Sequence, residues 1–145
     1  MNPSPPYAEL TDSIEVQVAP IYLPEQSLPD EGIFVYFYAI RIVNHGNTDA
    51  TLISMNWTVR DGQGKDDLIY ADNLLGDQPE IKARESYSYA SYCALKTPTG
   101  SVRGYYRIVF GNGEAKRIKI PLFFLRPEDE IDGNRGLYQS LNVGT

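Results

Sequence analysis

The chain has 145 residues, 42% of them hydrophobic and 12% aromatic, and its formal net charge at pH 7 is -6. This length predicts one domain that can bury a full core, and the hydrophobic content excludes a disordered chain. The acidic balance argues against nucleic acid as a partner, because phosphate repels such a domain unless its positive charges gather on one face.

The compartment is predicted from the cysteine content and from the lack of long apolar stretches. Cys93 is the only cysteine, so an intramolecular disulfide is excluded, and such a chain suits a reducing compartment. Residues 1–13 have neither a basic start nor an apolar run, so we expect no signal peptide. No stretch approaches the roughly 20 apolar residues that cross a bilayer. We therefore expect a cytoplasmic protein without a membrane partner.

Alternating apolar and polar residues predict a series of strands between two tails. Residues 1–12 are rich in Pro and Ser, and residues 127–145 are polar with scattered glycines, so both are predicted to be tails around a domain at residues 13–126. The predicted strands, in chain order, cover residues 14–18, 33–44, 51–60, 68–71, 86–93, 102–110 and 115–125. Proline and glycine mark the turns between most of them, and no helix is predicted.

Two of these strands indicate the architecture. Residues 33–44 are apolar on both faces, which is typical of a central strand. In residues 51–60 the alternation predicts that Ile53, Met55 and Trp57 point into the core. About seven strands with turns at this spacing predict an all-β fold, an antiparallel β-sandwich of the immunoglobulin or fibronectin type III kind.

The last two strands are predicted to form a hairpin with a three-residue loop. This loop places Arg107 opposite Arg117 and Tyr105 opposite Lys119, and it keeps the apolar residues together on the other face, which sets the register. One face then collects basic and aromatic residues: Arg103, Tyr105, Arg107, Arg117 and Lys119. Because like charges directly opposite are unfavourable, this face is a candidate site for an acidic partner or a bound anion. The alternative is that the long side chains splay apart in water or pair with acids elsewhere.

Residue types that carry catalysis or metal binding are not assembled at any point of the sequence. His45 is the only histidine, and no cysteine or acid stands near it at metal-ligand spacing. Cys93 ends a tyrosine-rich strand and is interpreted as a small buried residue. Asp66 and Asp67 are neighbours on a strand and point to opposite faces, which disfavours shared carboxylate chemistry, although loose divalent-ion binding stays open. The sequence predicts no catalytic residue, no metal site and no cofactor.

A series of short motifs resembles the ApaG domain family. They occur in one order between residues 13 and 126: Tyr22-Leu23-Pro24-Glu25-Gln26-Ser27, Trp57 before a turn, Gly76-Asp77-Gln78-Pro79, Tyr87-Ser88-Tyr89, Thr97-Pro98-Thr99-Gly100 and Gly104-Tyr105-Tyr106. The resemblance implies a fibronectin type III-like β-sandwich in a small cytoplasmic protein. It also implies a link to divalent-cation tolerance or nucleotide metabolism in bacteria, and use as a partner-recognition module in eukaryotic proteins. No catalytic residue is implied by it.

One segment departs from the family pattern. Many family members have a GxGxxG run, proposed to hold a pyrophosphate or nucleotide, where this chain has Ala71, Asn73 and Gly76. Backbone N–H groups reach a phosphate best where no Cβ obstructs them, and the two aspartates of this segment would repel it. We interpret residues 71–79 as a connecting loop, with Asn73, Gly76 and Gln78 as candidate contact residues.

The leading hypothesis from the sequence is a non-catalytic binding or protein-interaction module. Its predicted contact surfaces are the basic face of the last hairpin and the loops at residues 21–32 and 73–78, because binding residues concentrate on loops held by a rigid scaffold. The alternative is a sensor of small anions, pyrophosphate or nucleotides that uses the four cations of the hairpin face. A hydrolase, as a third class, would need His45 or Cys93. The partner is predicted to be a protein or a small phosphate-containing anion.

Overall fold

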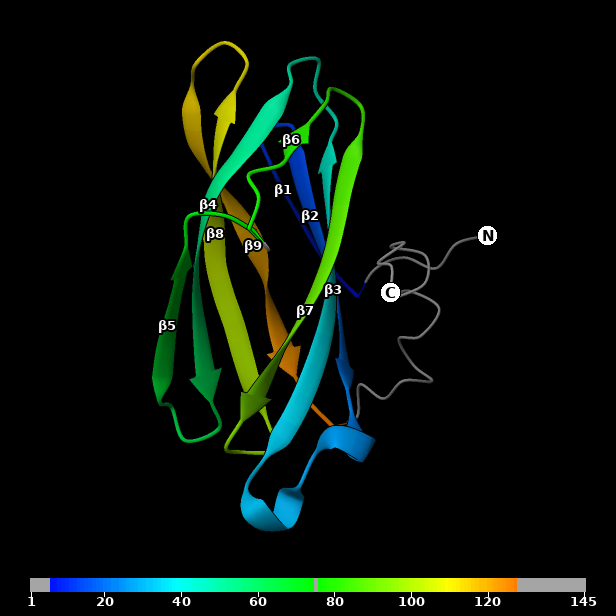
Figure 1. The fold of residues 1–145 in the computed structure, drawn as a ribbon, viewed down its shortest axis with the longest axis vertical. Helices are drawn as coiled ribbons and strands as arrows, with labels where there is room; N and C mark the ends of the chain where they lie inside the picture. The colour runs from blue at the N-terminus through cyan, green and yellow to red at the C-terminus, as the bar shows by residue number, and fades with distance from the viewer. Residues whose placement is uncertain (1–5, 75, 128–145) are drawn as a thin grey trace, which may run out of the picture.

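Nine antiparallel strands in two sheets make up the computed structural model, which describes residues 6–74 and 76–127 (Figure 1). The strands are β1 (Tyr7–Thr11), β2 (Ile14–Tyr22), β3 (Phe34–Asn44), β4 (Ala50–Asp61), β5 (Asp66–Ala71), β6 (Glu80–Ile81), β7 (Ser86–Leu95), β8 (Gly100–Phe110) and β9 (Ala115–Leu125). Two short 3₁₀ turns, η1 (Pro24–Gln26) and η2 (Pro29–Glu31), lie between β2 and β3. Within these residues no helix has the length and apolar character needed to cross a membrane.

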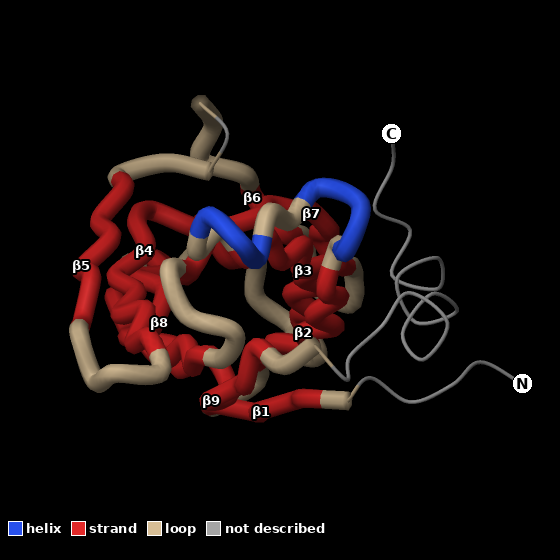
Figure 2. Tube along the Cα trace, turned by 90° about the horizontal axis from the view of Figure 1, so that it is seen from below, coloured by secondary structure: helices blue, strands red, loops and turns tan. Residues whose placement is uncertain are grey.

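The two sheets differ in size and face each other. One has four strands in the order β1-β2-β3-β7, and the other has five, β5-β4-β8-β9 with β6 also paired to β4. Seen from below, the sheets form two layers, with β5 at one edge and β1 beside β9 at the other (Figure 2). The predicted all-β antiparallel sandwich is confirmed, and β3 is central in its sheet as predicted. The strands that the sequence did not indicate are β1 and β6.

Residues 7–11 correct the prediction of an N-terminal tail. They form β1, which pairs with β2 along its whole length. The Tyr7 ring packs against Phe123, with the ring centroids 6.0 Å apart. This contact and the ladder hydrogen bonds offset the entropy lost when the segment becomes ordered. The alternation was hidden because Leu10 points outward and is 62% exposed. The tail predicted at residues 127–145 lies, from residue 128 onward, outside the described residues.

A β-bulge in β4 corrects the predicted core face of that strand. Its register with β8 shifts between Leu52 and Ser54, so one extra residue separates the two halves of the strand and the inward face changes. Leu52 is buried before the bulge and Trp57 is buried after it. The prediction that Ile53 lines the core is therefore wrong, whereas Met55 packs against the core as predicted.

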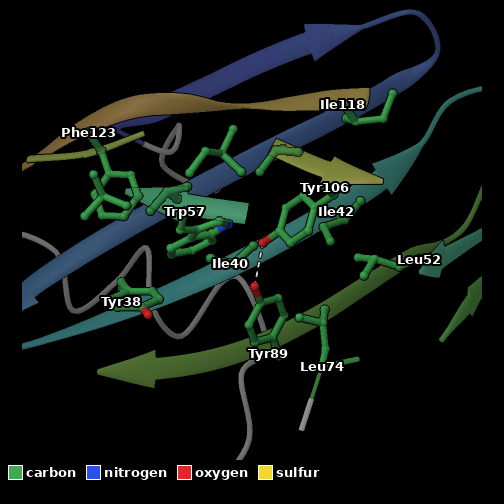
Figure 3. Packing of buried hydrophobic residues seen from close by; sticks show 14 of the residues in the cluster. Tyr38, Ile40, Ile42, Leu52, Trp57, Leu74, Tyr89, Tyr106, Ile118 and Phe123 are labelled. Carbon is green, nitrogen blue, oxygen red and sulfur yellow. Dashed lines mark hydrogen bonds between the residues drawn. The ribbon is translucent and has the colours of Figure 1, made fainter. Parts of the chain in front are cut away.

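Aromatic and branched aliphatic side chains fill the space between the sheets (Figure 3). Trp57 from β4 packs on Tyr38 from β3, with ring centroids 5.4 Å apart. The hydroxyls of Tyr89 on β7 and Tyr106 on β8 lie 2.5 Å apart, so their hydrogen bond joins the two sheets. Trp57, Tyr106 and Ile118 are all buried, which confirms the predicted core position of Trp57 and shows that the apolar face of the last hairpin points into the core.

Candidate functional site

Between Gly104 and the loop, the register of the β8–β9 hairpin is the one predicted from its apolar pattern; beyond Gly104 it shifts by one residue. Arg107 lies opposite Arg117, and Tyr105 lies opposite Lys119. The three-residue loop is closed by the backbone N–H of Phe110, which donates to the carbonyl of Glu114 at 2.8 Å. The basic and aromatic residues of both strands consequently share the outer face of the five-stranded sheet, with the core on its other side.

The same face continues across β4 to β5. Asn56 on β4 faces Tyr105 on one side and Tyr70 on the other, while the next row places Thr58 between Arg103 and Leu68. A groove of about 680 Å³ follows these rows, with β5 as one wall and the charged side chains of β8 and β9 as the other. We call it the outer-face groove; its lining residues include Asn56, Thr58, Leu68, Ile69, Tyr70, Arg103, Tyr105, Arg117 and Lys119.

The apolar wall of the outer-face groove was missed by the sequence analysis. Leu68 is 82% exposed and Tyr70 is 62% exposed. Apolar residues in a short strand are ordinarily interpreted as core, so the pattern alone did not mark them as a surface. The sequence feature that could have marked β5 as an exposed edge strand is the pair of aspartates at its start, because charged side chains are common on edge strands.

The cations of the outer-face groove differ in how far they are neutralised. Arg103 lies 3.4 Å from the carboxylate of Asp66. That carboxylate also accepts hydrogen bonds from Arg60 at 2.7 and 3.0 Å, and this guanidinium lowers the pKa of Asp66. The ammonium of Lys119 lies 3.9 Å from the carboxylate of Glu9. The predicted alternative, pairing with acids elsewhere, therefore holds for Arg103 and, more loosely, for Lys119.

Arg117 in the outer-face groove, and Arg107 on the same sheet face but outside the groove lining, are the two cations without such compensation. The guanidinium of Arg117 lies over the Tyr105 ring, 4.6 Å from its centroid, which is a cation–π contact. Neither arginine makes an ion pair within residues 6–74 and 76–127, although the two face each other across the hairpin. Within the part of the chain that the structure describes, no carboxylate occupies their donors, which can therefore bind an acidic group.

The loop at residues 71–79 is held by its own polar groups. The Gly76 N–H donates to Oδ1 of Asn73 at 3.0 Å, and the Gln78 amide donates to the carbonyls of Ile53 and Asp72 at 3.1 and 2.7 Å. The backbone N–H of Gly76, which a phosphate-binding loop would donate to its ligand, is thus already bonded within the loop. Asn73, Gly76 and Gln78 do not line the outer-face groove, so the structure separates them from the hairpin candidates.

The other predicted contact loop, at residues 21–32, begins later than predicted. Ile21 and Tyr22 belong to β2 and are buried. The Ser27 hydroxyl donates to the carbonyl of Leu23 at 2.8 Å and accepts from the backbone N–H of Val35 at 2.9 Å. These bonds fix the two 3₁₀ turns against the start of β3.

His45 and Cys93 lie at opposite ends of β3. His45 follows the last residue of that strand, and its ring nitrogen is 2.8 Å from the carboxylate of Glu15. Cys93 lies opposite Tyr36 on β3, and Tyr36 precedes Asn44 by eight residues. Eight residues of a strand span about 26 Å, which is the separation of the two ends of β3 at which Cys93 and His45 lie. Burial raises the pKa of the Cys93 thiol to about 11. No group of three or more His, Cys, Asp and Glu side chains in the described ranges is placed to hold a metal ion.

Comparison with known proteins assigns the chain to a family. The family model described as the ApaG domain matches residues 24–110. The Caulobacter vibrioides protein ApaG is 39% identical over 119 residues, which are 82% of this chain and 85% of that protein. The chain belongs to the ApaG family. The Anaeromyxobacter dehalogenans protein ApaG is 41% identical over 106 residues, covering 73% of this chain and 83% of that protein.

A solved structure that is 35% identical to this chain has the same fold. The crystal structure of the Bordetella pertussis protein called ApaA superposes with a TM-score of 0.77 and 35% identity, covering 86% of this chain and 97% of that one. The match to the ApaG domain spans η1 to the end of β8. It therefore includes the β4, β5 and β8 parts of the outer-face groove, whereas Arg117 and Lys119 on β9 lie beyond it.

Proposed function

We propose that this ApaG-family chain is a non-catalytic binding module that takes an acidic segment of a partner protein in the outer-face groove. The observation that carries the proposal is the pairing of an exposed apolar wall with uncompensated cations on one sheet face. Leu68 and Tyr70 form the wall, and Arg117 is the cation nearest to an aromatic ring. Exposed apolar surface bordered by polar groups is characteristic of interaction sites.

The apolar wall supplies affinity. Covering a side chain of the size of Leu68 contributes about 1.5–3 kcal/mol, and Tyr70 offers a large rigid ring with a polar tip, a type enriched at protein interfaces. The cations then supply orientation and speed of association more than raw affinity, because charges at a rim act mainly through steering. A ligand with one apolar anchor and neighbouring carboxylates satisfies both parts.

The width of the outer-face groove favours an extended peptide. Its apolar wall on β5 and its cations on β9 are three strand spacings apart, which is about 14 Å. An extended peptide of about four residues covers this distance at about 3.4 Å per residue. A single phosphate reaches only one side of the groove.

The experiment is a binding titration with a fluorescent peptide that carries one Leu or Tyr among Asp and Glu residues. Arg117→Glu is expected to weaken binding at least about tenfold, because an attractive contact becomes a repulsive one. Lys96→Glu makes the same change of charge outside the groove and is expected to leave binding nearly unchanged. Equal affinity of the Arg117→Glu variant and the wild-type protein would refute the proposal.

A second candidate function is recognition of a phosphate-containing anion, and the cation–π contact of Arg117 favours it. Tyr105 holds the guanidinium plane, and a planar fork of donors suits phosphate as well as carboxylate. Calorimetric titration with pyrophosphate, ATP and dinucleoside polyphosphates, with and without magnesium or cobalt, tests it. Anion binding that is lost in Arg117→Glu but retained in Leu68→Ser would indicate the anion site. Peptide binding that is lost in both variants would indicate the peptide site.

We further propose that the module acts in the cytoplasm and catalyses no reaction of its own. The separation of His45 from Cys93 along β3 supports the second statement. Hydrolytic turnover that disappears in His45→Ala or Cys93→Ala would contradict it.

A further inference from the structure

The free edge of β5 exposes backbone groups as well as side chains. β5 is the last strand of its sheet, and residues 66–70 are all exposed. At the turn, the backbone N–H of Asp61 donates to the carbonyl of Lys65 at 2.9 Å, and the β4–β5 register continues from there without a shift. In an antiparallel ladder, alternate residues bond to the partner strand. Ile69 therefore bonds to β4, while the N–H and C=O groups of Leu68 and Tyr70 point away from the sheet.

Apolar side chains follow this edge on both faces of the sheet. Leu68 and Tyr70 lie on the outer face, and Ile69, which is 37% exposed, lies on the other. Natural proteins usually protect an exposed edge with charges, proline or a bulge. Here the run from Leu68 to Tyr70 contains none of these. Such an edge is suited to accept another strand.

The charges around β5 nearly balance, although the chain carries a net charge of -6. Three cations and four acids lie on β5 and next to it: Arg60, Lys65, Arg103, Asp61, Asp66, Asp67 and Asp72. Two copies of an acidic protein repel each other over most of their surfaces. At this edge the repulsion is small, because Asp66 is already bound by two arginines.

We propose that a second copy of this chain adds to the sheet through β5, antiparallel and about a two-fold axis at Ile69. In this register Ile69 faces Ile69 of the second copy, and Leu68 faces Tyr70, so apolar residues meet on both faces. The outward backbone groups of Leu68 and Tyr70 exchange hydrogen bonds. Such an interface is self-complementary and closes with two copies.

The pairing extends the groove. The two five-stranded sheets become one continuous sheet, and the apolar walls of two outer-face grooves meet along the new edge. The dimer thereby offers two basic sites at a fixed separation to one partner, which strengthens binding to a partner with two acidic segments. Self-association does not depend on the peptide-binding proposal.

The first test is the oligomeric state in sedimentation experiments, from micromolar to millimolar protein and without any ligand. We expect a reversible shift toward twice the 16.3 kDa of one chain. Leu68→Pro removes an edge N–H without touching the bonds from β5 to β4, and it is expected to raise the dimer dissociation constant at least about tenfold. A circular dichroism spectrum checks that the variant is folded. Arg117→Glu, which disables the peptide site, is expected to dimerise normally.

The second test determines the register by disulfide trapping in a Cys93→Ala background with oxidised glutathione. Ile69→Cys places two thiols directly opposite each other at about 4.5 Å between Cα atoms, which a disulfide can bridge. Leu68→Cys is the matched control, since its two copies are offset by two residues in this register. We expect rapid cross-linking of the first variant and slow cross-linking of the second. A chain that stays monomeric at every concentration, a dimer unaffected by Leu68→Pro, or faster cross-linking of Leu68→Cys would overturn the proposal.

Discussion

Replacing Tyr106 by Phe tests how the two sheets are joined. The hydroxyl of Tyr106 lies 2.5 Å from that of Tyr89, and the two residues come from opposite sheets (Figure 3). Tyr106 is 0% exposed and Tyr89 is 6% exposed. Removing one hydroxyl therefore leaves the other buried without its partner.

The size of the effect follows from this burial. A buried polar group that loses its partner costs about 1–3 kcal/mol of stability, so Tyr106→Phe and Tyr89→Phe are each expected to destabilise the protein by that amount. The double variant removes both hydroxyls and leaves none stranded. Its free energy of unfolding is expected to fall by no more than that of either single variant, which is a coupling of at least about 1–3 kcal/mol.

Urea unfolding followed by circular dichroism measures all four proteins of this cycle. Equal slopes against urea would show that the same surface is exposed on unfolding, so that the midpoints report stability. Additive losses in the double variant would refute the reasoning, because they would mean that the hydroxyls act independently.

Three further predictions concern the core and the backbone. Burial raises the pKa of Tyr38 to about 12 and raises the pKa values of Tyr89 and Tyr106 further. These groups are neutral in the folded protein, so the stability that they confer is complete below about pH 10. As pH rises above about 10, stability is expected to fall at about 4 kcal/mol per pH unit for three groups, and the contribution of Tyr38 is lost by about pH 12. Urea unfolding that gives the same stability from about pH 9 to about pH 12 would contradict this. Gly104→Ala places a Cβ 2.1 Å from the carbonyl oxygen of Asn56 and is expected to cost more than about 3 kcal/mol of stability. The Cβ of Gly113→Ala meets nothing within 4 Å, so this variant is expected to cost about 1 kcal/mol. Equal shifts of the melting temperature in the two variants would disprove the clash. Because burial raises the pKa of Cys93, its reaction with a thiol reagent at pH 8 is expected to be at least about tenfold slower in the folded than in the unfolded protein, and equal rates would contradict this.

The sequence predicted those features that depend on neighbouring segments. The β8–β9 hairpin is an example: only a three-residue loop keeps Tyr106 and Ile118 on one face, so the register followed from the apolar pattern. The same register predicts the pairing of Arg107 with Arg117.

Features that depend on distant segments were not predictable in this way. The bulge at Ile53 arises where β4 pairs with β8, a strand that follows about 50 residues later in the chain. Leu68 and Tyr70 have the same apolar character whether a second sheet covers β5 or not, and only the packed sandwich shows that none covers the outer face. Tyr7 likewise gains its partner, Phe123, from the other end of the domain.

Nuclear magnetic resonance titration of the labelled protein with the acidic peptide tests the outer-face groove most directly. We predict that the amide signals of Tyr70, Tyr105 and Lys119 shift together, with a single affinity that falls as salt is added. Shifts confined to the loop at residues 72–79, or to the four-stranded sheet, would contradict the assignment of binding to the outer-face groove.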